Sequence, residues 1–264
     1  MTEASIAPAY LRGMIPGIHP AIPGGRPLRV VGDVHGDDTA FSYACATDRF
    51  IVQLGDLTDY GPDGAGVLER MFALLDAGQG LFLRGNHDAK LARLLAGDRV
   101  QMSPALAATR AALNPALAAR ALAEIARAPL WLRDGSRLFV HGGFHPEMAR
   151  HPAPAVPIGR PPPPGTPSGA AIARALFGEP TGRQQEDGYP ERSLRWIADI
   201  PAGLTVYCGH DRRSTDGRPL VRRNAAGGRV VFLDTGAGKG GHLSWIDLDP
   251  APADTPAAPT TTDK

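Results

Sequence analysis

The amino-acid sequence predicts an α/β fold in which two packed sheets are flanked by helices. Three observations support this prediction. Short apolar runs of strand length recur along the chain, and the early ones end in small polar loops. A segment rich in Ala, Leu and Arg at helical spacing separates the early runs from the late ones. Strands therefore alternate with helices early and follow one another late, which favours two sheets with helices outside them.

The composition is that of a soluble globular protein. The 264 residues can bury the core of one large domain or two small ones, and the apolar content of 43% is ordinary. A net charge of +1 creates no overall field, so we expect neither stable nucleic-acid binding nor attraction to a membrane. Cys45 and Cys208 provide no disulfide framework, and the N-terminus lacks the features of a signal peptide. We therefore expect a cytoplasmic protein.

The predicted domain extends over residues 28–249. Residues 1–27, rich in Pro and Gly, are expected to form an irregular arm that leads into the first strand. Residues 250–264, dominated by Pro, Ala and Thr, are expected to form a disordered tail. Within the domain, apolar runs predict strands at 30–31, 52–54, 81–83, 138–140, 204–208, 230–233 and 243–246.

Two long segments connect these strands. Residues 88–128 carry apolar side chains at helical spacing and are expected to form a small helical cap beside the site. Pro104 and Pro115 stand where helices begin, and Asn114 is the expected N-cap of the later helix. The Pro-rich stretch over residues 146–190 is expected to form a surface loop.

Three early strands end in loops that carry metal-binding residue types. They read Gly-Asp-Val-His-Gly at 32–36, Gly-Asp-Leu-Thr-Asp-Tyr-Gly-Pro-Asp at 55–63 and Gly-Asn-His-Asp at 85–88. Ligands of open α/β sheets bind beyond the carboxyl ends of the strands, so we expect these loops to form one site. Later strand ends add His141 and His210.

This set of Asp, His and Asn side chains suits a centre of two divalent metal ions. Hydrolysis of a phosphoester requires a hydroxide nucleophile and neutralisation of the phosphoryl charge, which two metals ~3.5–4 Å apart provide. Carboxylate and imidazole ligands suit Mn, Fe or Zn. Asp33 and His35 lie two residues apart, so they can point to one side of an extended segment, and Asp56 is a candidate bridging ligand.

The motifs, taken in order, resemble those of the calcineurin-like metallophosphoesterases. The resemblance covers residues 28–248 and rests on the three loops together with His-Gly-Gly at 141–143 and Gly-His at 209–210. It is strongest for the phosphoprotein-phosphatase-like branch, which also holds symmetrical diadenosine tetraphosphate hydrolases. The resemblance implies a four-layer α-β-β-α sandwich of two mixed sheets with a small helical cap. It also implies a site that holds two divalent metals, with Mn expected first and Fe and Zn as alternatives.

The resemblance also implies roles for individual residues, carried over by motif position. The first metal would be bound by Asp33, His35 and Asp56, and the second by Asp56, Asn86, His141 and His210. His87 would donate a proton to the leaving oxygen, and Asp59 would orient it, since such a pair favours the imidazolium. Arg84, directly before the Gly-Asn-His motif, would clamp the phosphate.

The chain departs from the resemblance at Tyr60, where the family usually has an arginine that contacts substrate phosphate. A tyrosine offers one hydroxyl without charge, so the loss of a bidentate contact is expected to weaken phosphate binding by a few kcal/mol. Arg212 or Arg213, directly after His210 and Asp211, is the candidate replacement. Asp211 itself stands where relatives often have Thr. We expect these departures to change substrate preference and to leave the metals in place.

A softer likeness to bacterial enzymes of this branch covers two later segments. They read Thr-Gly-Arg-Gln-Gln-Glu-Asp-Gly-Tyr-Pro at 181–190 and Asp-Thr-Gly followed by Gly-Gly-His-Leu at 234–243. The second contains Gly238 and Lys239, which resemble part of a phosphate-binding P-loop. The spacing does not match that motif, because Leu233 stands where the first glycine is required. No role is therefore predicted for Lys239.

The leading hypothesis is a dimetal phosphoesterase that cleaves phosphomonoesters or phosphoanhydrides by attack of metal-bound hydroxide. The resemblance favours a serine/threonine-protein-phosphatase-like enzyme acting on a phosphoprotein. The alternatives are a symmetrical bis(5'-nucleosyl)-tetraphosphatase and an RNA or nucleotide phosphatase. A non-enzymatic alternative is a scaffold with weakened catalysis. Such a scaffold should show gaps among the ligands, and here only Tyr60 points in that direction.

Overall fold

The structure is a computed structural model that describes residues 21–159, 168–186, 189–214 and 216–250. Most of the expected N-terminal arm, the four consecutive prolines at 161–164 and the expected C-terminal tail lie outside the described residues. Within them, the first strand begins at Leu28 and the last strand ends at Leu248.

The first sheet contains Leu28–Val31 (β1), Phe50–Gln53 (β2), Gly80–Phe82 (β3) and Trp245–Leu248 (β11). The order across the sheet is β11–β1–β2–β3, with β1, β2 and β3 parallel and β11 antiparallel to β1. The parallel strands are buried along nearly their whole length. They therefore read as continuous apolar runs, because strands covered on both faces do not alternate.

The second sheet contains Trp131–Asp134 (β4), Arg137–Val140 (β5), Thr205–Cys208 (β8), Leu220–Arg223 (β9) and Arg229–Phe232 (β10). Their order is β4–β5–β8–β10–β9. The three central strands are parallel, and β4 and β9 are antiparallel edges. Both sheets are thus mixed, as predicted. The two edge strands were not predicted, because their side chains are partly exposed and lack a continuous apolar run.

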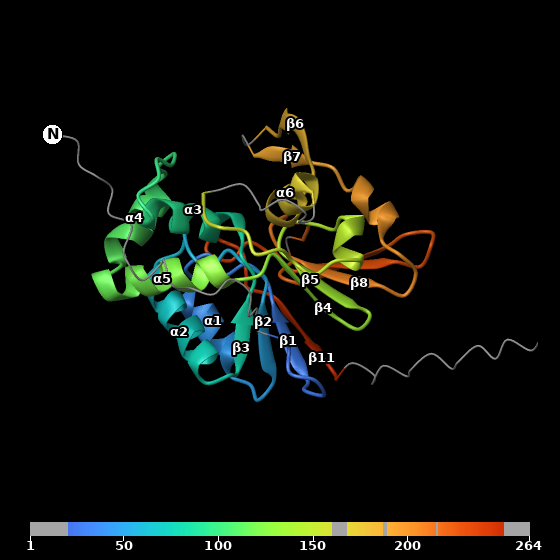
Figure 1. Cartoon of the computed structure of the whole chain (residues 1–264), viewed down its shortest axis with the longest axis horizontal. Helices are drawn as coiled ribbons and strands as arrows, with labels where there is room; N and C mark the ends of the chain where they lie inside the picture. Colours follow the sequence, from blue (N-terminus) through green and yellow to red (C-terminus); the bar gives the residue numbers. More distant parts are fainter. Residues whose placement is uncertain (1–20, 160–167, 187–188, 215, 251–264) are drawn as a thin grey trace, which may run out of the picture.

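Helices cover the outer faces of both sheets. The α-helices of the described residues are Asp38–Cys45 (α1), Gly64–Asp76 (α2), Asn86–Leu95 (α3), Pro104–Ala112 (α4), Pro115–Arg127 (α5) and Gly169–Phe177 (α6). Two short 3₁₀ helices, Pro146–Ala149 (η2) and Arg195–Asp199 (η3), complete the set. In Figure 1, α1, α2 and α5 flank the sheet of β1–β3, while α6 lies above β5.

Three apolar clusters define four layers. Phe41 and Leu122 belong to the cluster between the first sheet and its helices. Val52 and Val231 belong to the cluster in which the inner faces of the two sheets meet. Trp196 belongs to the cluster that joins the second sheet to α6, η2 and η3. The layers therefore follow the order helix, sheet, sheet, helix, which confirms the predicted fold class.

The segment expected to form a helical cap contains most of α3 and all of α4 and α5. Pro104 and Pro115 begin their helices, and the Asn114 side chain accepts the N–H of Leu117, as predicted. Side chains of all three helices join the same apolar cluster as α1 and α2. The segment is therefore continuous with the helical layer of the first sheet.

The segment at 146–190, expected to be a surface loop, contains a helix and a hairpin in its described part. Ser168 caps α6 and Gly178 ends it with a φ of 65°. Strands Pro180–Gln184 (β6) and Pro190–Arg192 (β7) follow as a separate hairpin. Ile172 on α6 packs into the cluster beneath the second sheet, so burial stabilises a helix that the surrounding prolines conceal in the sequence.

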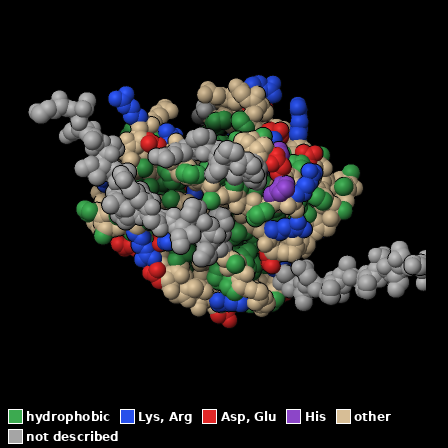
Figure 2. Space-filling view, viewed as in Figure 1, with side chains coloured by type: hydrophobic (Ala, Val, Ile, Leu, Met, Phe, Trp, Pro, Cys, Tyr) green, Lys and Arg blue, Asp and Glu red, His purple; other side chains and the backbone are tan. Residues whose placement is uncertain are grey.

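The surface carries charges of both signs. Figure 2 shows basic and acidic side chains interspersed among the described residues of one face. Several form ion pairs, such as Arg120 with Asp76 at 2.6 Å. This distribution accords with the net charge of +1. In the part of the chain that the structure describes, no helix has the length and apolar character needed to cross a membrane.

Candidate metal centre

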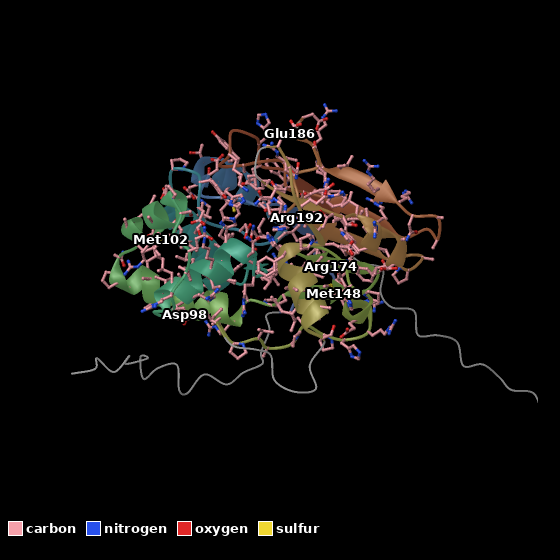
Figure 3. The ribbon with its side chains drawn as sticks, turned by 90° about the horizontal axis from the view of Figure 1, so that it is seen from above. Asp98, Met102, Met148, Arg174, Glu186 and Arg192 are labelled. Atoms are coloured by element: carbon pink, nitrogen blue, oxygen red, sulfur yellow. The ribbon has the colours of Figure 1, made fainter. Side chains whose placement is uncertain are left out.

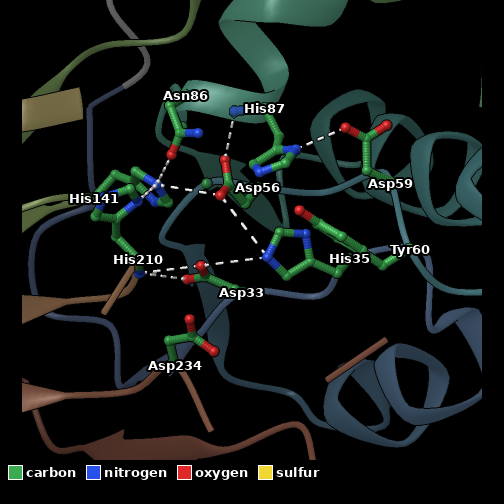
Figure 4. A network of polar contacts seen from close by, with 12 residues as sticks. Asp33, His35, Asp56, Asp59, Tyr60, Asn86, His87, His141, His210 and Asp234 are labelled. Atoms are coloured by element: carbon green, nitrogen blue, oxygen red, sulfur yellow. Dashed lines mark hydrogen bonds and ion pairs between the residues drawn. The ribbon is translucent and has the colours of Figure 1, made fainter. Parts of the chain in front are cut away.

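The loops after β1, β2 and β3 converge with the loops after β5 and β8, as Figure 4 shows. Because parallel strands end on the same edge of a sheet, residues far apart in the sequence meet there. Four of the predicted metal ligands follow strands of the first sheet and two follow strands of the second. They are Asp33, His35, Asp56 and Asn86 from the first, and His141 and His210 from the second.

Asp33, His35 and Asp56 form the first group of possible ligands. Their ligand atoms lie within 4.8 Å of one another, and all three residues are buried. Nε2 of His35 is 3.8 Å from Oδ2 of Asp33 and 3.8 Å from Oδ2 of Asp56. This spacing leaves room for a cation between the three side chains.

The second group shares Asp56 with the first. Nε2 of His141 lies 3.4 Å from Oδ2 of Asp56 and 3.1 Å from Nδ1 of His210. The side-chain oxygen of Asn86 is 3.1 Å from the same His141 nitrogen. Asp56 therefore belongs to both groups of possible ligands.

The hydrogen bonds of the candidate histidine ligands leave ring nitrogens available to bind a cation. Nδ1 of His35 lies 3.1 Å from the Thr58 carbonyl and Nδ1 of His141 lies 2.9 Å from that of Leu54, so each Nδ1–H donates. In a neutral ring this leaves a lone pair on Nε2. Among the described residues, Nε2 of His35 is one of the buried side-chain nitrogens without a hydrogen-bond partner. Buried lone pairs of this kind are what metal ligands require.

The centre favours positive charge. Burial and neighbouring Asp234 raise the pKa of Asp33 well above its usual value. Although burial acts to lower it, the carboxylates of Asp56 and Asp33 raise the pKa of His141 to about 9. Burial lowers the pKa of His35 to about 3, so this ring is neutral and able to bind a metal. A divalent cation would offset the cost of burying these carboxylates together.

His87 lies beside the metal ligands and is held by Asp59. Its Nδ1 donates to Oδ2 of Asp59 at 2.6 Å. Although burial acts to lower it, Asp56 and Asp59 raise the pKa of His87, which favours the imidazolium. The second oxygen of Asp59 accepts from the Thr109 hydroxyl at 3.0 Å, and the Asp59 N–H donates to that hydroxyl at 3.3 Å. Helix α4 thus supplies a side chain that fixes Asp59.

Backbone strain is concentrated in this centre. Non-glycine residues rarely adopt a positive φ, because the Cβ then lies too close to the backbone. Such strain persists at sites where the surrounding structure enforces it. Among the described residues, positive φ values outside glycine occur at His35, Asp56, Asp59, Tyr60 and His210, each of them a predicted site residue. The carboxylate of Asp88 holds one of these turns by accepting the N–H groups of Asp56 and Leu57.

Two glycines allow the ligands to approach the backbone. A Cβ at Gly209 would overlap the Asp33 carboxylate, which accepts the N–H of His210 at 3.0 Å. A Cβ at Gly85 would overlap the Asp56 carboxylate. Any larger residue at either position would therefore displace a candidate metal ligand.

A pocket of about 390 Å³ opens beside His210. Arg192 reaches it from β7, and Figure 3 places this residue near the middle of the view, with Glu186 at the outer edge. The hydroxyls of the two lining tyrosines lie 3.4 Å apart. The pocket lining thus combines cationic and aromatic side chains with two carboxylates, those of Asp211 and Asp234. Its cationic and aromatic lining residues are Arg192, Arg212, Lys239, Tyr60 and Tyr189.

The structure does not bring Arg84 or Arg213 to this pocket. Arg84 is buried, and its guanidinium donates to the Val156 carbonyl and to two carbonyls at the C-terminal end of α5, over 2.6–2.9 Å. Nε of Arg213 donates to Asp211 at 2.8 Å. Of the residues predicted to bind phosphate, Arg212 and Tyr60 line the pocket.

The sequence analysis assigned no role to Thr109, Asp234, Lys239 or Arg192, which all belong to the site. Thr109 is a polar residue on the otherwise apolar, buried face of α4. A polar side chain at such a position indicates a buried hydrogen-bond partner. Asp234 follows β10 as closely as Asp33 follows β1. Its place at the site could therefore have been predicted from the strand that precedes it. Lys239 is one of three lysines in a chain that otherwise uses arginine, which is a weaker signal.

The chain is similar to known phosphoesterases in both sequence and structure. A family model described as calcineurin-like phosphoesterase matches residues 26–213. The chain is similar to bis(5'-nucleosyl)-tetraphosphatase PrpE [asymmetrical] of Geobacillus thermodenitrificans, with 30% identity over 82% of this chain and 88% of the relative. A symmetrical bis(5'-nucleosyl)-tetraphosphatase of Acidovorax is 41% identical over 27% of each chain. A solved structure named as a diadenosine tetraphosphatase superposes with a TM-score of 0.54 at 19% identity, over 90% of this chain and 97% of that one.

Proposed function

The chain belongs to the calcineurin-like phosphoesterase family and is a metal-dependent phosphoesterase; on this premise we propose that it hydrolyses dinucleoside polyphosphates such as diadenosine tetraphosphate. The observation that carries the proposal is the pocket beside the candidate metal ligands, in which three cationic side chains outnumber two carboxylates. The similarity to bis(5'-nucleosyl)-tetraphosphatases over most of both chains supports it.

We assign the two groups of candidate ligands to two divalent cations, with Mn²⁺ as the first choice. When bound, such cations generate a nucleophile from water at neutral pH and neutralise charge on the phosphoryl oxygens. Asp56 belongs to both groups and would connect them. The residues that would hold the cations are Asp33, His35, Asp56, Asn86, His141 and His210.

We assign the proton donor to His87. Its Nδ1 is engaged by Asp59, so Nε2 is the nitrogen that is left to face the substrate. The imidazolium form, favoured by Asp56 and Asp59, can donate to the oxygen that leaves the phosphorus atom. Asp59 is in turn fixed by Thr109, so the ring of His87 is oriented before substrate binds.

The cationic pocket suits a substrate with several phosphates. A phosphomonoester places one phosphoryl group on the metals, whereas a tetraphosphate chain carries further negative groups that need their own partners. Arg192, Arg212 and Lys239 line the adjacent pocket and can receive them. Tyr60 and Tyr189 are partly exposed there and add aromatic surface to the pocket wall.

The substrate class that the sequence favoured is therefore replaced by another. The sequence favoured a protein-phosphatase-like enzyme, whereas the relatives and the pocket favour its alternative, a hydrolase of dinucleoside tetraphosphates. The relative that spans most of the chain is of the asymmetrical type, while the symmetrical type matches over 27% of the chain. We therefore propose off-centre cleavage, which yields ATP and AMP from diadenosine tetraphosphate.

Product analysis tests this proposal. The purified protein with Mn²⁺ is incubated with diadenosine tetraphosphate, and the nucleotides are separated by anion-exchange chromatography. We expect ATP and AMP, and a kcat/KM that exceeds that for phosphoserine peptides by about tenfold or more. Two equivalents of ADP would instead establish central cleavage. Faster turnover of phosphopeptides would contradict the proposed substrate class, and a D56N preparation controls for contaminating hydrolases.

A further inference from the structure

Lys239 is held close to the metal ligands by its own loop. Its N–H donates to the Gly236 carbonyl at 3.0 Å, and the N–H of Gly241 donates to the same oxygen at 2.9 Å. Gly238 has a φ of 68°, and a Cβ there would overlap the backbone carbonyl of His35. The loop therefore packs directly against the segment that supplies a metal ligand, and the position of Lys239 relative to the centre is fixed.

The ammonium of Lys239 is available to a ligand. It lies 4.5 Å from the ring centroid of Tyr60 and 5.9 Å from that of Tyr189, as cation–π contacts require. Within the described residues it makes no hydrogen bond and no ion pair. The side chain is half-buried and lines the pocket. A lysine that has lost part of its hydration without gaining an acceptor is poised to bind an anion.

Tyr60 positions this cation without neutralising it. Its ring centroid lies 5.1 Å from that of His35 and 5.3 Å from that of His87, so the tyrosine stands at the edge of the centre. The phenol of a tyrosine is uncharged at neutral pH. The ring face attracts the ammonium electrostatically while leaving its N–H groups free on the other side.

We propose that Lys239, seated on the face of Tyr60, binds a phosphate group of the substrate beside the metal centre. In this way it supplies the positive charge that Tyr60 lacks at the position where the resemblance implies an arginine. Arg213 cannot take this role while it is paired with Asp211. The inference deepens the proposed function, on which it rests for the identity of the longer phosphate chain.

Steady-state kinetics with simple phosphates tests Lys239 separately from the proposed function. K239M keeps the apolar stem that packs on Tyr60 and removes the charge. For K239M with Mn²⁺, we expect KM for p-nitrophenyl phosphate and Ki for inorganic phosphate to rise together by about tenfold. We expect kcat to stay within about twofold of the wild-type value. The lost contact would stabilise the bound substrate and the transition state equally, so its removal changes KM and not kcat. K239R should keep both constants near the wild-type values.

The matched control is K90M, which removes the same group from α3, away from the pocket lining. Its constants should equal those of the wild type. Y60R in the K239M background places a cation back at this edge of the centre, and we expect it to recover most of the lost phosphate affinity.

The outcomes separate the two proposals. If K239M keeps KM and Ki within twofold of wild type, Lys239 does not bind phosphate and the inference is overturned. A rise in both constants supports it even if diadenosine tetraphosphate is not a substrate, and that result would overturn the proposed function alone. The double variant K239M/Y60R could melt at the wild-type temperature and yet recover no phosphate affinity. In that case an arginine at position 60 does not replace the ammonium of Lys239, and this part of the inference is wrong.

Discussion

Asp56 is the residue on which both groups of metal ligands depend. Its Oδ2 lies 3.8 Å from Nε2 of His35 and 3.4 Å from Nε2 of His141. We expect D56N to lower turnover by about 100-fold or more, because a neutral amide binds both cations poorly. Kinetics and metal content by mass spectrometry check this prediction. A variant that keeps the wild-type rate with metals bound would show that Asp56 is not the bridge.

Thr109 tests whether the orientation of Asp59 matters. Replacement by valine keeps the shape but leaves the N–H and one carboxylate oxygen of Asp59 without their buried partner. We expect T109V to lower kcat for p-nitrophenyl phosphate by about tenfold with little change in KM, because the proton donor loses its support. T109S keeps the hydroxyl and should retain activity. Equal kcat values in the two variants would assign Thr109 a packing role alone.

Arg84 is the residue whose predicted role the geometry most clearly opposes. Burial lowers the pKa of Arg84 to about 10, so it is charged at neutral pH, and its donors are used on backbone carbonyls. We expect R84M to reduce the free energy of unfolding by about 3 kcal/mol and to leave KM unchanged. R212M, in the exposed pocket wall, should show the reverse pattern. Urea denaturation and steady-state kinetics on both variants distinguish a structural role from a phosphate-binding role. A raised KM in an R84M protein of wild-type stability would show that Arg84 binds phosphate after all.

At the scale of secondary structure, Arg29 connects β1 to β11 through a two-pronged bond to Asp247, at 2.7 and 2.8 Å. This hydrogen bond lowers the pKa of Asp247, so its stabilisation is present above the unfolded-state pKa of about 4 and disappears as the pH falls through the lower folded-state value. The pair is partly exposed, so solvent screens it. We expect D247N to cost about 0.5 kcal/mol at neutral pH.

Urea denaturation of wild type and D247N between pH 7 and pH 3 measures this contribution. The difference between the two proteins should be constant down to about pH 4 and shrink below it. A difference that persists unchanged at the acid end would mean that the aspartate does not act through its charge.

The elements that sequence patterns predict well are those whose signal is local. A buried parallel strand appears as a continuous apolar run, and its ligand-bearing loop follows directly, as with β1 and Asp33. Edge strands such as β9 are mostly exposed and carry arginine, so the pattern disappears. Helix α6 has clear caps at Ser168 and Gly178, but its proline-rich surroundings pointed to a loop. Local chemistry was thus informative wherever burial made the pattern continuous.

Local sequence patterns could not predict contacts between elements that are distant in the chain. Thr109 and Asp59 are 50 residues apart, and only the packing of α4 beside the loop after β2 joins them. The same holds for Lys239, which meets Tyr60 because the loop after β10 packs against the loop after β1. Ligands follow strands in a regular way, whereas supporting residues depend on how loops and helices pack. Their identity therefore emerged only from the structure.

At the scale of the whole molecule, the metal centre joins the two sheets. The ligands from the first sheet face His141 and His210 from the second, and the Asp33 carboxylate accepts the His210 N–H across the junction. Cations bound there would therefore cross-link the two halves of the sandwich. Without them, the buried carboxylates of Asp33 and Asp56 lose their main compensation.

Removal of the metals should therefore destabilise the folded protein as a whole. A cation that binds the folded state at 100 times its Kd adds about 2.7 kcal/mol, because the unfolded chain lacks the site. For a chain of this size, that corresponds to a fall in melting temperature of about 5–10 °C on treatment with EDTA, reversed by Mn²⁺. Differential scanning calorimetry measures the shift. H141A, which lacks a ligand from the second sheet, should respond much less to EDTA because the link between the sheets is already weakened. If the wild-type melting temperature is the same with EDTA and with Mn²⁺, the cations do not hold the two sheets together.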